Sequence, residues 1–116
     1  MTPDEVAAAP SVVRWFESAR LHGDTEDEKQ LRYRLLGDFS DHIGQSPDEV
    51  VAGLMRTTKK GETAISGKRR AAMDASIDEF MEKSGFTGRD AVVNGNIIRS
   101  FLVHNGIFIQ GRAWRG

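Results

Sequence analysis

Cysteine is absent from this chain of 116 residues, and no long apolar run occurs in it. The lack of cysteine excludes disulfides, thiolate zinc sites and cysteine nucleophiles, and it is typical of proteins from a reducing compartment. No apolar stretch approaches the roughly 20 residues of a membrane-spanning helix. The N-terminal MTPDEVAAAP carries acids where a secretory signal needs cations. We therefore expect a cytoplasmic protein without membrane contact.

Residue types that carry catalytic or metal chemistry are few and scattered. The three histidines, His22, His42 and His104, each lie near the end of a predicted helix, where an imidazole favours the negative end of the helix dipole. Their separation does not indicate a metal site. No nucleophile, base and acid occur at a recognisable spacing. We expect no enzyme activity, no cofactor, no metal and no small-molecule substrate.

The spacing of apolar residues predicts a single all-α domain. A chain of this length can bury one core without disulfides or metals. Apolar residues recur at helical spacing most clearly at Leu31, Leu35, Phe39 and Ile43. With their caps and glycine ends, the apolar segments predict helices over roughly 2–22 with a break at Pro10, 27–43, 46–55, 67–83 and 87–105. We expect a compact bundle of four to five helices over 1–109 and a flexible tail or linker over 110–116.

The segment Val92–Ile98 is ambiguous between two structures. Its Asn-Gly pair between β-branched residues is typical of a hairpin turn. The Thr87 cap with Asp90, the apolar spacing and the Asn105-Gly106 ending instead favour one helix, and their agreement outweighs the turn signal. We favour the helix. Gly95 then lowers helix stability by about 1 kcal/mol relative to alanine, unless a neighbour packs on its bare backbone.

One predicted helix start differs from the others in charge. Ser66 is followed by Gly67 and then by cations at 68–70. Cations at a helix N-terminus cost a few tenths of a kcal/mol each unless an anion sits there, and a phosphate is the natural candidate. The other four starts pair a Ser/Thr cap with an acid three residues on: Thr2 with Glu5, Thr25 with Glu28, Ser46 with Glu49, and Thr87 with Asp90.

The whole stretch Arg56–Arg70, RTTKKGETAISGKRR, is strongly basic. It holds six cations and one acid, a charge of +5, whereas the rest of the chain holds ten basic and sixteen acidic residues, a charge of −6. This polarity points to nucleic acid, although a solvated basic loop has the same composition. A nucleotide phosphate loop is excluded, because five residues separate Gly61 from Gly67 where four are needed and Arg69 replaces the magnesium-binding Ser or Thr.

Two stretches resemble a known family. YRLLGDFSDHIGQSPDEVVAGLM (33–55) joins a helix ending in Phe-x-x-x-Ile-Gly to Ser-Pro-Asp-Glu and an apolar helix, and IIRSFLVHNGIFI (97–109) is a closing helix with an Asn-Gly-Ile exit. In these patterns of packing and capping, the chain resembles the core-binding, SAM-like N-terminal domain of tyrosine recombinases and phage integrases. The resemblance covers most of the chain, from about Val12 to Ile109.

The resemblance implies DNA binding without catalysis. In that family the domain is a helical bundle that clamps one face of duplex DNA, while a separate domain supplies the catalytic arginines, histidine and tyrosine. The only tyrosine of this chain, Tyr33, lies among predicted core leucines. The implied role is support of site-specific recombination or DNA integration. The implied partners are double-stranded DNA and other recombinase subunits or an accessory protein.

The resemblance also predicts which residues face the DNA. Asn94, Asn96 and Arg99 would read base edges, since arginine suits guanine and asparagine suits adenine. The basic-segment cations would contact phosphates and set position rather than sequence. The full predicted set is Arg32, Arg34, Lys59, Lys60, Lys68, Arg69, Arg70, Arg89, Asn94, Asn96 and Arg99.

An alternative function is a helical protein-interaction module whose basic patch docks an acidic partner. One structural feature separates the two hypotheses. DNA binding predicts that Arg89 and Arg99 lie on the same side as Lys68–Arg70.

Overall fold

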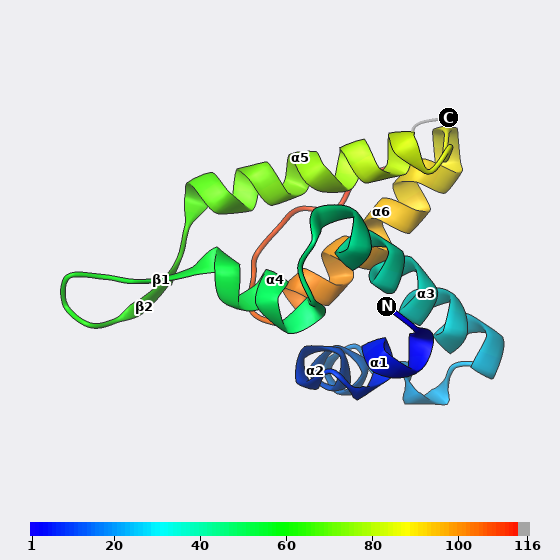
Figure 1. The fold of residues 1–116 in the computed structure, drawn as a ribbon, viewed down its shortest axis with the longest axis horizontal. Coiled ribbons are helices and arrows are strands. Elements are labelled where there is room, and N and C mark those ends of the chain that lie inside the picture. Colours follow the sequence, from blue (N-terminus) through cyan, green and yellow to red (C-terminus); the bar gives the residue numbers. More distant parts are fainter. Residues whose placement is uncertain (114–116) are drawn as a thin grey trace.

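The computed structural model describes residues 1–113 and is mostly helical (Figure 1). Residues 114–116, including Trp114 at the end of the expected tail, lie outside the described residues. The all-α class is confirmed. No helix in the described part is long and apolar enough to cross a membrane. The elements are α1 (Pro3–Ala8), α2 (Pro10–Ser18), a 3₁₀ turn (Leu21–Gly23), α3 (Glu26–Ile43), α4 (Pro47–Leu54), β1 (Met55–Thr57), β2 (Thr63–Ile65), α5 (Gly67–Lys83) and α6 (Gly88–Val103).

The helix starts follow the predicted caps, with one exception. Thr2 and Ser46 each form a reciprocal capping box with the glutamate three residues on, and a proline begins each of these helices. Thr25 and Ser66 also accept a backbone hydrogen bond in the first turn. The expected Thr87 cap does not form. The chain enters α6 through Gly88 at φ +56°, a left-handed conformation that differs from an ordinary first helical residue.

Helix α3 lies at the centre of the packing. It contacts α1, α4, α5 and α6, and its Leu36 and Phe39 are almost completely buried. Trp15 of α2 packs edge-to-face on Phe101 of α6, with ring centroids 5.6 Å apart. Tyr33 stacks on Phe16 at 4.9 Å and is packed against the core, as predicted. In Figure 1, α5 runs along one side of the molecule, and α1 and α2 lie on the other.

The basic segment contains a β-hairpin where the sequence predicted a loop. Strands β1 and β2 pair antiparallel, with Met55 opposite Ile65 and Thr57 opposite Thr63. The backbone N–H of Gly61 donates to the Thr58 carbonyl at 2.9 Å, and Gly61 takes φ +78°. A tight turn closed by a left-handed glycine is a common three-residue hairpin loop. The hairpin projects beyond the helices at the end of the molecule where α5 begins (Figure 1).

Residues after α6 return across the bundle. Ile107 and Ile109 are buried in the core, although Phe108 between them is 74% exposed. Further along, Asn96 holds the backbone of Arg112 from both sides: its amide nitrogen donates to the Arg112 carbonyl at 2.7 Å, and its oxygen accepts from the Arg112 N–H at 2.8 Å. Contacts between the chain and the helices therefore continue past the expected boundary between 109 and 110, because Arg112 is fixed to α6.

Residues 92–98 lie inside α6, which confirms the predicted helix over the alternative hairpin. Gly95 faces α5 and is buried. A β-carbon at Gly95 would lie 2.8 Å from Nη1 of Arg99 and 3.7 Å from side-chain carbons of Ile77 and Met81. The guanidinium is the far end of a long side chain, but two aspartates hold it in place, so it has little freedom to move aside. The helix-stability gain expected for alanine is outweighed by this contact.

We predict that Gly95→Ala lowers the free energy of unfolding by about 1–3 kcal/mol, because it overpacks a tightly occupied interface. Gly53→Ala in α4 is the matched control, since no atom lies within 4 Å of a β-carbon there. The control should raise stability by up to about 1 kcal/mol. Urea unfolding of both variants measures the difference, and a stabilised Gly95→Ala variant would contradict the packing described.

Candidate nucleic-acid interface

We refer to the cations of the hairpin and of the α5 start as the basic surface: Arg56, Lys59, Lys60, Lys68, Arg69 and Arg70. Lys59 and Lys60 occupy the turn and are exposed at its tip. The turn also holds Glu62, whose backbone N–H donates to the Thr58 hydroxyl at 3.2 Å. Extended strands rise about 3.3 Å per residue, so the six residues from Lys60 to Ser66 place the tip lysines roughly 20 Å from the start of α5.

The first turn of α5 combines a capped helix N-terminus with positive side chains. Ser66 caps the helix by accepting from the Arg69 N–H, and no acid lies in the first turn. The Arg69 and Arg70 guanidiniums each donate one hydrogen bond at 3.2 Å, to the carbonyls of Gly53 and Phe108 respectively. These bonds fix the two arginines beside the helix start. The helix dipole and the cations therefore add to one positive field, as the sequence predicted.

Arg99 does not lie on this surface, and its prediction as a base-reading residue is wrong. Its side chain is only 2% exposed and sits between α6 and α5. Nε donates to Asp74 at 2.8 Å, and Nη2 donates to Asp78 at the same distance. Two carboxylates compensate the buried charge, which explains how an arginine can occupy a core position.

Asn96 and Arg32 are also engaged within the protein. Both amide atoms of Asn96 bind the backbone of Arg112, so this amide is not available to an adenine. The guanidinium of Arg32 pairs with Asp24 at 2.5 Å on the side of α3 near the 3₁₀ turn. Asn94 is partly buried within α6. Within residues 1–113, none of these three side chains is hydrogen-bonded to a residue of the basic surface.

Arg89 and Arg34 are exposed, and Arg89 is distant from the basic surface. Arg89 begins α6 just after α5 has ended, whereas Lys68 lies at the start of α5 (Figure 1). At 1.5 Å per residue, the two ends of α5 are about 24 Å apart. The predicted condition that Arg89 and Arg99 share a side with Lys68–Arg70 is therefore not met. The candidate interface is smaller than the sequence predicted and is centred on the hairpin.

Arg112 completes a charge cluster that the sequence did not reveal. Its Nη2 donates to Asp74 at 2.9 Å and to Asp78 at 3.0 Å, so both aspartates bridge Arg99 and Arg112. Burial raises the pKa of Asp74, but the hydrogen bonds from Arg99 and Arg112 outweigh it and hold that pKa below its ordinary value. The hydrogen bonds that Arg112 donates to Asp74 and Asp78 raise the pKa of Arg112. We refer to Asp74, Asp78, Arg99 and Arg112 as the α5–α6 charge cluster.

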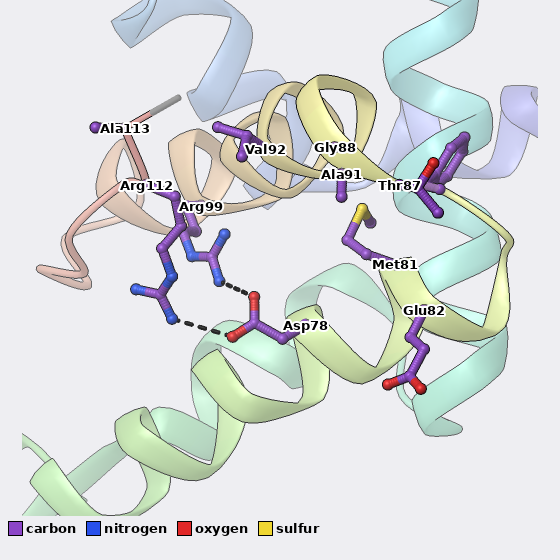
Figure 2. A pocket seen from close by; sticks show the side chains of 11 residues that line it. Asp78, Met81, Glu82, Thr87, Gly88, Ala91, Val92, Arg99, Arg112 and Ala113 are labelled. Atoms are coloured by element: carbon purple, nitrogen blue, oxygen red, sulfur yellow. Dashed lines mark hydrogen bonds and ion pairs between the residues drawn. The ribbon is translucent and has the colours of Figure 1, made fainter. Parts of the chain in front are cut away.

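A cavity of about 550 Å³ lies beside this cluster, between the end of α5, the start of α6 and the returning chain. Figure 2 shows Arg99 and Arg112 next to each other and both facing Asp78, with Met81 and Ala91 further along the cavity. The charged groups of Asp78, Arg99 and Arg112 are bound to one another. This wall of the cavity is therefore neutralised, and Glu82 is the remaining charged residue among the described lining. Within residues 1–113, no group of three or more metal-ligating side chains occurs.

Comparison with known proteins adds no assignment. No family model, no curated protein and no solved structure matches the chain.

We predict that Arg99→Ala lowers the free energy of unfolding by about 3 kcal/mol, because it leaves two aspartates without their buried partner. Arg89→Ala on the same helix is the control and should change stability by no more than about 0.5 kcal/mol. Thermal and urea unfolding measure both. A base-reading Arg99 would give the opposite pattern, with stability retained and DNA affinity lost.

The charge cluster also predicts a pH dependence of stability. A carboxyl whose folded-state pKa is depressed stabilises the fold above its unfolded pKa, about 4, and loses that contribution as pH falls through the folded value. Asp74→Asn should be less stable than the parent protein by about 1–3 kcal/mol at pH 7. This gap should narrow as pH falls from 5 to 2, measured by urea unfolding at each pH. A gap that stays constant over this range would contradict the assignment.

Proposed function

We propose that this protein binds double-stranded DNA through the basic surface. We further propose that it is a non-catalytic, integrase-type core-binding domain with a SAM-like fold that supports site-specific recombination or DNA integration. The observation that carries the proposal is the projecting hairpin. It has two lysines at its tip, and its other end leads into the cation-rich start of α5. Duplex DNA offers a dense row of phosphates to such a surface, and each neutralised phosphate releases a counterion.

The geometry of the hairpin supports a duplex as the partner. A two-stranded ribbon is one of the two elements that fit the major groove, which is about 12 Å wide. The roughly 20 Å between the tip lysines and the α5 start exceeds that width, so cations at the two ends of the ribbon can meet phosphates on either side of one groove. The hairpin contains no aromatic residue. The hairpin itself therefore offers no platform for stacking on unpaired bases, the usual means of binding single strands.

The family proposal depends on the stretches that carry the resemblance. Residues 33–55 form the later part of α3, the Ser46-capped α4 and the start of β1, while 97–109 form the end of α6 and the buried residues after it. These elements pack around one core, which is what the resemblance predicts. The face used here differs from the predicted one, because Arg32, Asn96 and Arg99 are bound within the protein.

The alternative, a module that docks an acidic protein, is favoured by one observation. Phe108 is 74% exposed and its carbonyl accepts from Arg70, so a large apolar side chain stands beside the basic surface. Exposed aromatic groups next to arginine are common at the centre of protein interfaces. The position of Arg89, away from the basic surface, is also consistent with this function.

The proposed function predicts the salt dependence of DNA binding. Changing Lys59, Lys60 and Lys68 to alanine should weaken binding to any duplex and reduce the slope of log K against log salt by up to about 0.9 per lost phosphate contact. Arg34, Lys83 and Arg89, changed to alanine together, form a control with the same change in charge. The control should leave the slope unchanged in a fluorescence anisotropy titration over a range of salt.

The outcomes separate the candidates. An equal loss of slope in both triple variants would place the DNA face elsewhere or spread it over the molecule. A protein that binds no duplex at low salt would overturn the proposed function. If Phe108→Ala and the hairpin variant then both abolish binding to an acidic protein, the interaction module replaces it.

A further inference from the structure

Arg56 occupies a distinct position on the hairpin. Along a strand, successive side chains point to opposite faces. Met55 and Ile65, which face each other across the ribbon, pack against the core, so their face is turned toward the helices. Arg56 therefore lies on the outer face, where its cross-strand neighbour is Ala64. This pairing makes Arg56 the one long side chain on the outer face of β1 and β2.

Arg56 also differs from the other arginines of the basic surface. Arg69 and Arg70 each donate to a backbone carbonyl of the protein. The Arg56 side chain is exposed, and no hydrogen bond or ion pair joins it to another side chain or to the backbone within residues 1–113. Its guanidinium thus keeps two parallel N–H donors for a planar acceptor pair, which a guanine offers through O6 and N7 in the major groove.

The position of Arg56 relative to the lysines determines what it can reach. Lys59 and Lys60 lie at the tip of the ribbon and Lys68 lies beyond its base, while Arg56 lies between them on the outer face. When Lys59 and Lys60 contact phosphates on one side of a groove and Lys68 contacts phosphates on the other, the outer face of the ribbon between them lies over base edges. Phosphate contacts set the position of a protein, and side chains between them read the sequence.

We propose that Arg56 is a specificity-determining residue that contacts guanine in the major groove, with the hairpin lying in that groove. This inference rests on the proposed function and adds a sequence preference to it. The A-form groove of double-stranded RNA is too narrow and deep for this contact, so the preference belongs to B-form DNA.

The experiment uses the whole chain and a pool of randomised duplexes. Selection should return a guanine at one position. Replacing that guanine with 7-deazaguanine, which removes the N7 acceptor, should weaken binding of the parent protein by about 5- to 150-fold. Arg56→Lys keeps the charge but loses the planar pair of donors. This variant should keep the salt slope, lose most of the preference, and show little further loss on the 7-deazaguanine duplex.

Lys60→Ala serves as the control. It should weaken binding to all duplexes alike and keep the full preference for guanine over 7-deazaguanine. Selection without any preferred base pair, or a preference that survives in Arg56→Lys and Arg56→Ala, overturns the role of Arg56 while leaving DNA binding in place. Failure of the parent protein to bind any duplex overturns the proposed function itself, and this inference with it.

Discussion

The buried guanidinium of Arg99 is the interaction on which the arrangement of this molecule most depends. Burying an arginine is unfavourable unless carboxylates surround it, and Asp74 and Asp78 of α5 meet that need. The same two aspartates bind Arg112, so one set of charges joins α5, α6 and the returning chain. Gly95 makes room for the guanidinium on α6. The cluster joins the middle of α5 to α6, and together with the buried Ile77, Phe80 and Met81 it holds α5, and the cations at its start, against the rest of the molecule.

The helices could be predicted from the sequence because their signals are local. Caps such as Ser46 with Glu49, and the glycine that ends α3, depend on residues a few positions apart and acted as expected. In the predicted apolar stripe of α3, Leu35 and Phe39 are buried, but Leu31 is 49% exposed. The hairpin was missed because its strands are only three residues long. Its one local signal is the turn: two lysines followed by Gly61, which takes a left-handed conformation, between β-branched and apolar residues.

The candidate site was harder to predict than the fold. The sequence located the basic segment, because charge is read directly from composition. It could not separate the exposed Arg89 from the buried Arg99, since both are arginines on one helix and only contacts with α5 distinguish them. The role of Asn96 depends on Arg112, sixteen residues further on. Pairings of this kind arise from tertiary structure, so the spacing of apolar residues along the sequence does not predict them.

The central claim is that a duplex is held by the hairpin and the start of α5. An NMR titration of the isotope-labelled chain with a short duplex tests it most directly, because each backbone amide reports separately. The account predicts that the largest shifts fall within residues 56–70, while amides around Arg34 and Arg89 change little. Shifts centred on α3 or on the start of α6, with the hairpin unaffected, would contradict it.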